Sequence, residues 1–206
     1  MRKTEVKKLL KRRDELLHTH EELNYSCYDV DNTTLVDSIY KNSRNEISNI
    51  LHNIDIELLN YVKEFVVGRW LLQIKGITPD LAAGLLAYFD VKDKDCAAQF
   101  IRFAGIDDST KPYNNNIGKI MSDVKNNLIR QDGLYKKLAL NKFIDLTKND
   151  GLDVHVAINR SNRYMLKIFI GHLFEEMYRE EHDGELPIRY NDFDKIIIEP
   201  EVPYTK

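Results

Sequence analysis

The segment with the clearest chemical meaning is the run from Ile74 to Phe89, which reads IKGITPDLAAGLLAYF. A short apolar helix is expected to end at Lys75, and a second helix rich in small residues is expected to begin at Pro79. Between them Gly76 permits a tight turn that leaves backbone N–H groups pointing outward. These groups and the positive end of the second helix can hold a phosphate. The pattern is that of a helix-hairpin-helix, which predicts contact with a nucleic-acid backbone without reading of the bases.

Thr78 departs from the usual helix-hairpin-helix pattern, in which a second glycine occupies its position. Its hydroxyl can still donate a hydrogen bond to a phosphate oxygen. The alternative interpretation is an ordinary tight turn between two helices. Burial separates the two interpretations: a binding turn leaves the amides of residues 76–80 exposed beside basic side chains, whereas an architectural turn buries them.

A second group of basic residues lies on a helix that we expect over residues 157–181. Arg160, Arg163 and Lys167 are spaced by three and four residues, so they line one face of this helix. The stripe can continue a phosphate-binding track from the Gly76 turn, and the alternative is a solvated face without a ligand. The complete set of predicted nucleic-acid-binding residues is Lys75, Gly76, Ile77, Thr78, Arg102, Lys111, Lys119, Arg160, Arg163 and Lys167.

No other pattern in the sequence makes a complete catalytic, metal or cofactor site. His172 stands one helical turn before Glu175 and Glu176, a spacing that suits a metal site or an acid–base pair, but a third ligand is lacking. The alternative is a salt-bridged helix face. Cys27 and Cys96 are far apart and predict reduced thiols in a cytosolic protein. We therefore predict no catalytic residue, no metal and no cofactor.

Two long amphipathic helices are expected to precede the Gly76 turn. The first spans residues 3–24, and the second begins near Thr33 or Thr34 and runs to about Val67 with neither Pro nor Gly in between. The short link between them favours an antiparallel helical hairpin or coiled coil, which would form an oligomerisation arm. The alternative is that both helices simply pack on the core.

Composition and charge are typical of an intracellular helical protein. The 206 residues are 43% hydrophobic and 31% charged, with nine glycines and five prolines, a mixture that suits long helices. Residues 175–206 carry ten acidic and four basic residues, whereas residues 1–174 have a net charge of +3, so nucleic acid is expected to meet the earlier part. No run is long and apolar enough for a signal peptide or a membrane span. A cytoplasmic location without a membrane partner is expected.

The central segments resemble the C-terminal transposase domain of the bridge-RNA-guided insertion-sequence recombinases. That domain has a Gly-Ile-Gly-Pro turn, an Ala-rich helix, and a Phe-containing helix that ends in Ala-Gly-Leu before a Pro. The resemblance covers residues 68–175 and includes the family's Gly…Ser-Lys…Leu-Arg segment and its final helix. The matching positions are Gly76, Ile77, Pro79, Ala83, Phe100, Phe103, Ala104, Gly105, Ile106, Pro112, Gly118, Ser122, Leu128, Arg130 and residues 157–167.

The resemblance implies a helix-hairpin-helix DNA-binding domain behind a coiled coil, in a protein of a mobile element or phage. The family's ribonuclease-H-like domain, with its four acidic residues, has no counterpart in residues 1–206. The family's nucleophilic serine is also missing, because residues 111–116 read KPYNNN and Ser109 is out of register. We therefore expect a binding protein more than an enzyme, with a residual recombinase or nuclease as an alternative.

The expected architecture is all-α, with a helical arm over residues 1–67 and a helix-hairpin-helix domain over residues 68–182. An acidic extended tail is expected over residues 183–206, with one small strand or hairpin at residues 196–198. The expected function is non-catalytic, weakly sequence-specific binding of double-stranded DNA, with RNA as an alternative partner. The protein is expected to be a homo-oligomer, located in the host cell if a phage encodes it. The alternative function is a helical interaction or structural protein in which the Gly76 turn is architectural.

Overall fold

The computed structural model of the chain describes residues 1–26, 34–92, 94–107, 114–185, 187, 199–200 and 202–203. Within these residues the backbone forms eight α-helices and no strand, which confirms the predicted all-α fold. The predicted strand or hairpin at residues 196–198 lies outside the described residues, as does Cys27. The helices are α1 (Lys3–Ser26), α2 (Thr34–Lys63), α3 (Val66–Leu71), α4 (Pro79–Tyr88), α5 (Ala97–Phe103), α6 (Asn115–Arg130), α7 (Leu134–Lys148) and α8 (Val154–Glu181).

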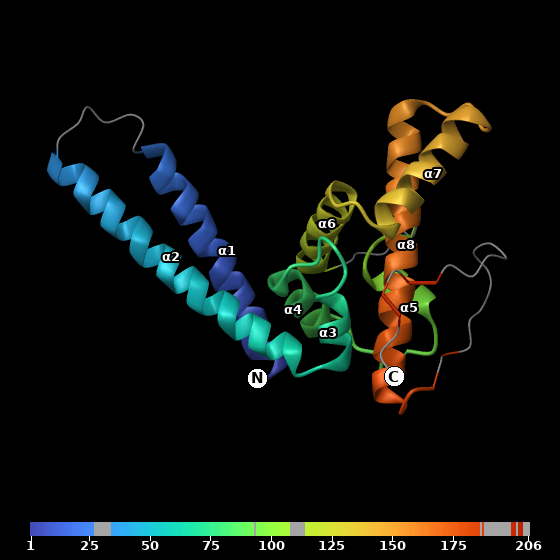
Figure 1. Cartoon of the computed structure of the whole chain (residues 1–206), viewed down its shortest axis with the longest axis horizontal. Coiled ribbons are helices and arrows are strands. Elements are labelled where there is room, and N and C mark those ends of the chain that lie inside the picture. The colour runs from blue at the N-terminus through green and yellow to red at the C-terminus, as the bar shows by residue number, and fades with distance from the viewer. Residues whose placement is uncertain are drawn as a thin grey trace.

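Helices α1 and α2 lie side by side at one end of the molecule and run in opposite directions (Figure 1). The Arg13 guanidinium donates a hydrogen bond to Asp55 Oδ1 at 2.6 Å. Nearer the free end of the pair, Arg44 Nη1 donates to Asn24 Oδ1 at 3.0 Å. As the α1 residue number rises between these two contacts, the α2 number falls by the same amount, which is the register of an antiparallel pair. We call these two helices the arm.

The arm joins the rest of the molecule at its base. Val6, Leu58 and Val62 are completely buried there, where α1 and α2 both pack against α4. Arg13 extends the contact to α4 with an ion pair, in which its Nη1 lies 3.2 Å from Asp80 Oδ2. The start of α4, which follows the Gly76 turn, is therefore held by both helices of the arm.

The second helix ends earlier than the sequence predicts. It stops at Lys63 rather than near Val67, and α3 begins after a turn. In this turn the N–H of Phe65 donates to the carbonyl oxygen of Val62 at 3.2 Å. Gly68 permits the chain to turn back closely, because a Cβ at that position would collide with the Val62 carbonyl. The break therefore depends on a close approach between α3 and the end of α2, and not on a helix-breaking residue inside α2.

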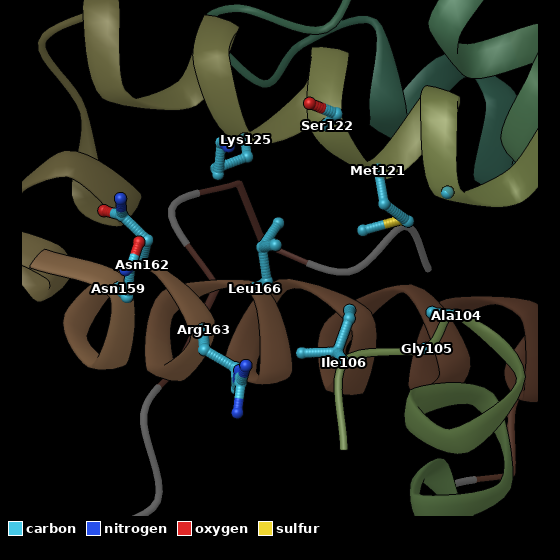
Figure 2. A pocket seen from close by; sticks show the side chains of 11 residues that line it. Ala104, Gly105, Ile106, Met121, Ser122, Lys125, Asn159, Asn162, Arg163 and Leu166 are labelled. Atoms are coloured by element: carbon cyan, nitrogen blue, oxygen red, sulfur yellow. The ribbon is translucent and has the colours of Figure 1, made fainter. Parts of the chain in front are cut away.

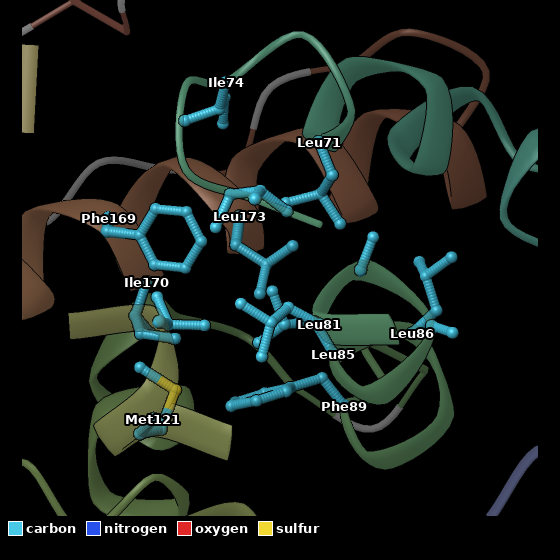
Figure 3. Close-up of a cluster of buried hydrophobic side chains, with 14 of the residues drawn as sticks. Leu71, Ile74, Leu81, Leu85, Leu86, Phe89, Met121, Phe169, Ile170 and Leu173 are labelled. Atoms are coloured by element: carbon cyan, nitrogen blue, oxygen red, sulfur yellow. The ribbon is translucent and has the colours of Figure 1, made fainter. Parts of the chain in front are cut away.

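Helix α4 is the central element of the hydrophobic core. All residues from Leu81 to Ala87 are buried, because α1, α2, α3 and α6 pack around this helix. Small residues let these neighbours approach: a Cβ at Gly84 would lie 3.0 Å from Ile120 Cδ1 of α6. Figure 3 shows Leu85 of α4 in one cluster with Leu173 of α8. The apolar, Ala-rich sequence of α4 thus reflects burial on every side.

Helices α7 and α8 form a second antiparallel pair at the other end of the molecule (Figure 1). Helix α8 begins before the predicted residue 157, because Asp153 caps it and accepts the N–H of His155 at 2.9 Å. Inside the pair, the hydroxyl of Tyr135 and Nδ1 of His172 lie 2.9 Å apart, and both side chains are buried. The pair is therefore joined by a polar contact as well as by apolar packing.

A pocket of about 290 Å³ opens where the end of α5 meets α6 and α8 (Figure 2). Gly105, with φ of +68°, ends α5, and the N–H of Ile106 then donates to the carbonyl of Ile101 at 3.1 Å. This is a helix C-cap in which glycine takes the left-handed conformation. The lining residues are Ala104, Gly105 and Ile106; Gly118, Met121, Ser122 and Lys125 of α6; and Asn159, Asn162, Arg163 and Leu166 of α8.

Candidate nucleic-acid interface

The turn between α3 and α4 is anchored in the core at both ends. Helix α3 stops at Leu71, earlier than expected, and tight turns lead on to Gly76, whose φ is +97°. Ile74 and Ile77 are buried, and the N–H of Ile77 donates to the carbonyl of Ile74 at 3.1 Å. Lys75 is exposed between them. The turn thus presents a lysine outward from a fixed base.

The start of α4 holds main-chain donors that have no acceptor. Thr78 is exposed and is the N-cap residue, but its side chain makes no capping hydrogen bond, and Pro79 occupies the first helical turn. Among the described residues, the N–H groups of Thr78, Asp80 and Leu81 donate to no acceptor, whereas that of Ala82 donates to the Thr78 carbonyl at 2.9 Å. Unpaired N–H groups at the positive end of a helix suit an anion.

Gly76 packs against the C-terminal half of α6. A Cβ at residue 76 would lie 3.0 Å from the carbonyl oxygen of Asn127 and 3.3 Å from Cγ of Gln131. The positive φ and this close approach both favour glycine. One side of the turn is therefore closed by α6, and a ligand has to reach it from another side.

Basic residues gather where the turn adjoins the link between α6 and α7. Lys136 Nζ donates to Asp132 Oδ1 at 2.6 Å. This hydrogen bond and the charge of Lys136 hold the pKa of Asp132 below its ordinary value, and the charges of Lys75 and Lys137 lower it further. The shared effect on one carboxylate places the three lysines in one region. Lys75 and Lys137 are exposed and form no ion pair within the part of the chain that the structure describes.

Acidic residues gather on the side of the turn that faces the arm. Partial burial raises the pKa of Asp123 on α6. The charge of Lys119 opposes this shift, and the like charges of Asp14 and Asp80 add to it. Lys119 itself pairs with Asp14 of α1 at 2.5 Å. A phosphate is therefore attracted from the side of Lys75 and repelled from the side of the arm.

The other predicted binding residues differ in how much charge they offer. Arg102 on α5 lies 3.6 Å from Asp107, and Lys119 pairs with an acid of α1, so both are partly neutralised. Arg160 is exposed on α8 and forms no ion pair within the described ranges. Lys111 lies outside the described residues. Arg160 is thus the most available charge of this group.

Arg163 and the Gly76 turn contact different residues of α6 and its C-cap. Arg163 lines the pocket together with Lys125 of α6, whereas Gly76 lies against the main chain of Asn127 and the side chain of Gln131. No residue of the turn is among those that line the pocket. A phosphate track from the turn to Arg163, and on to the half-buried Lys167 one turn further, therefore needs two separate groups of contacts.

Lys136, Lys137 and Lys125 are candidate binding residues that were missed in the sequence. The available signal was local charge, because residues 114–167 contain ten basic and five acidic residues. The net charge of +3 for residues 1–174 does not show this excess, because it also includes the charges of the arm. The closeness of Lys75 to Lys136 and Lys137 depends on packing between segments that are far apart in the sequence.

The residues around His172 form a packing arrangement. His172 is paired with Tyr135, and the Tyr135 ring meets Phe169 edge-on with 5.3 Å between ring centroids. Glu176 is buried, with Oε2 at 3.9 Å from Nη1 of Arg179. Within the described residues, no group of three or more His, Cys, Asp or Glu side chains is placed to hold a metal ion.

Comparisons with known proteins assign no family to this chain. No protein-family model, curated protein or solved structure matches it. The resemblance to transposase domains therefore rests on the residues named above. Among the described helices, none combines the length and apolar character that crossing a membrane requires.

Proposed function

We propose that this protein binds duplex nucleic acid through the phosphate backbone at the Gly76 turn and does not act on it chemically. The observation that carries the proposal is the set of unpaired N–H groups of Thr78 and Asp80 in the turn that also carries exposed Lys75, whose charge acts on Asp132 together with that of exposed Lys137. A phosphate can accept from such N–H groups and neutralise the lysines at the same time.

The proposed contacts give little sequence preference, because phosphate oxygens are the same at every base pair. Double-stranded DNA is the proposed partner and RNA the alternative. The resemblance of the Gly76 turn and the Ala-rich α4 to transposase domains supports a mobile-element or phage context. The lack of a serine in residues 111–116 supports a non-catalytic role.

The charges around the turn define the direction from which the duplex approaches. Lys75, Lys136 and Lys137 lie toward the α6–α7 link, whereas Asp80 and Asp123 lie toward the arm. The duplex is therefore proposed to lie across the start of α7, away from the arm. Arg160 is available to a second part of the same duplex if the strand passes around α6.

A gel-shift titration tests this function. The full-length protein is mixed with a short duplex DNA, its separated strands and duplex RNA, each over a salt series. We expect a shift of the duplex at low salt, with the logarithm of the affinity falling linearly with the logarithm of salt concentration. Lys75→Glu is expected to weaken binding about tenfold or more. The matched control is Lys63→Glu, an exposed lysine at the end of α2. Absence of any shift, or equal binding by Lys75→Glu, contradicts the proposal.

A second candidate function is self-association through the arm, and exposed isoleucines favour it. Ile39 and Ile50 of α2 are 57% and 46% exposed, and their spacing puts them on one face of the helix. In a coiled coil, a partner helix covers an exposed apolar face such as this one. Light scattering is expected to give a mass above the 24.1 kDa of one chain, and Ile39→Glu with Ile50→Glu is expected to restore the single-chain mass. A single-chain mass for the parent at every concentration removes this candidate.

A further inference from the structure

The pocket between α5, α6 and α8 is separate from the Gly76 turn. No residue of the turn is among those that line the pocket, and Gly76 lies against the main chain of Asn127 and the side chain of Gln131 instead. The pocket volume of about 290 Å³ is just below the range of small-molecule sites, about 300–1,000 Å³. An occupant of this pocket is therefore a small ligand, and it is distinct from a phosphate held at the turn.

Lys125 brings a positive charge to the pocket that no acid on its own helix neutralises. The residues three and four positions away are Met121, Ser122, Leu128 and Ile129, none of them acidic. Lys125 is partly buried and forms no ion pair within the part of the chain that the structure describes. No carboxylate is among the described residues that line the pocket. This environment favours an anion.

The pocket has a polar end and an apolar end. Figure 2 shows Lys125 at the edge of α6 that faces α8, with Asn159 and Asn162 of α8 at the same end of the pocket. Met121 from α6 and Leu166 from α8 reach into the space further along the two helices. In the same view the Arg163 side chain points away from α6, so it stands at the edge of the pocket.

These groups match a ligand that joins a phosphate to a ring. The ammonium of Lys125 can bind phosphate oxygens, and the amides of Asn159 and Asn162 both donate and accept hydrogen bonds, as hydroxyls and base edges require. The apolar side chains of Met121 and Leu166 can cover the face of a ring. We propose that the pocket binds a nucleoside monophosphate, either as a free nucleotide or as the phosphorylated end of a nucleic-acid strand.

Calorimetric titration of the full-length protein tests this proposal. The probes are thymidine 5′-monophosphate, thymidine, and one oligonucleotide prepared with and without a 5′-phosphate. We expect saturable binding of the monophosphate, and at least about tenfold weaker binding of thymidine, because the contact with Lys125 is lost. The oligonucleotide pair identifies the source: tighter binding with the 5′-phosphate than without it assigns a strand end, and equal binding of the two assigns a free nucleotide.

Two variants link binding to the pocket. Lys125→Gln removes the charge and keeps a polar side chain that is one atom shorter, and it is expected to weaken monophosphate binding about tenfold. Lys63→Gln, on the distant end of α2, is the charge-matched control and is expected to bind as the parent does. Asn162→Asp places a carboxylate in the same pocket as Lys125 and is expected to weaken binding by a similar factor. It is the second variant if Lys125→Gln does not fold.

The outcomes are distinguishable from those of the duplex-binding test. Absence of saturable monophosphate binding, equal binding of thymidine, or unchanged binding by folded pocket variants overturns the nucleotide site. Because Lys75 lies at the turn and Lys125 in the pocket, Lys75→Glu is expected to retain monophosphate binding. Failure of duplex binding with retained monophosphate binding contradicts the turn alone, and the reverse result contradicts the pocket alone.

Discussion

Oε2 of Glu180, in the last turn of α8, accepts the main-chain N–H of Val67, in the first turn of α3, at 2.8 Å. Its other oxygen accepts the N–H of Val66 at 3.0 Å. The N-cap residue of α3, Phe65, has no side chain that can do this. A carboxylate from a helix distant in the sequence therefore caps α3 and stabilises its positive end. Because the Gly76 turn follows α3, this contact also helps to position the turn.

Glu180→Ala is expected to lower the free energy of unfolding by about 0.5–2 kcal/mol, the usual effect of losing a helix cap. Urea denaturation followed by circular dichroism measures it. Glu181→Ala is the matched control, because Glu181 is an exposed neighbour and surface substitutions change stability by about 0.5 kcal/mol or less. Equal stability of the two variants would show that the cap contributes nothing.

Gly76→Ala is expected to be more destabilising than Gly151→Ala. Both glycines have positive φ, +97° and +62°. A Cβ at residue 76 meets the Asn127 carbonyl oxygen at 3.0 Å, whereas at residue 151 it meets nothing within 4 Å. Gly151→Ala therefore measures the cost of φ alone, about 1–2 kcal/mol, and thermal unfolding compares the two. If both variants lower the melting temperature equally, a Cβ at residue 76 does not collide with α6.

Arg13→Ala is expected to destabilise the protein by about 1–3 kcal/mol, because hydrogen bonds to charged groups are among the stronger ones. Arg13 is one-fifth exposed and bridges Asp55 at 2.6 Å and Asp80 at 3.2 Å. Its neighbour Arg12 is exposed and, among the described residues, pairs with Glu15 of its own helix at 3.4 Å. Arg12→Ala is therefore expected to change the free energy of unfolding by about 0.5 kcal/mol or less. Chemical denaturation of the two variants decides whether Arg13 joins the arm to α4.

Asp123→Asn is expected to stabilise the protein near neutral pH. Burial, with the charges of Asp14 and Asp80, raises the pKa of Asp123 above the ordinary 3.8. The folded state therefore binds this proton more tightly than the unfolded state, so ionisation of Asp123 reduces stability as pH rises above 3.8. The variant is expected to equal the parent well below that pH and to exceed it above the raised pKa, as thermal unfolding across pH can show.

Asp145→Asn provides the control of opposite sign. Hydrogen bonds from Asn149 and Lys142 lower the pKa of Asp145, so the ionised form contributes stability that is present at neutral pH and lost as pH falls. This variant is expected to be less stable than the parent near neutral pH. A change in stability of both variants in the same direction would contradict the assigned pKa directions.

Removal of the Asp123 charge is also expected to tighten duplex binding at the Gly76 turn.

The sequence alone determined that the chain is helical and located the helices of the arm, α4 and α8, because helix formation depends on neighbours within a few residues. It predicted no separate helix for α6 (Asn115–Arg130) or α7 (Leu134–Lys148). Apolar spacing predicted a first helix over residues 3–24, and α1 spans Lys3–Ser26. It also predicted one helix to about Val67, whereas α2 ends at Lys63. That end depends on the contact of Gly68 with Val62 across the turn, which hydrophobic periodicity does not record.

Only the tertiary structure determined which charged residues lie around the candidate sites. The sequence placed Gly76 in a turn because glycine tolerates positive φ, which is a local property. It did not show that Lys75 shares a region with Lys137, or that Asp123 lies near Asp80, because the members of each pair are far apart in the sequence. The pocket at Lys125 has the same origin, since α5, α6 and α8 each supply part of its wall. Electrostatic effects depend on distance in space, and only the packing of the helices sets that distance.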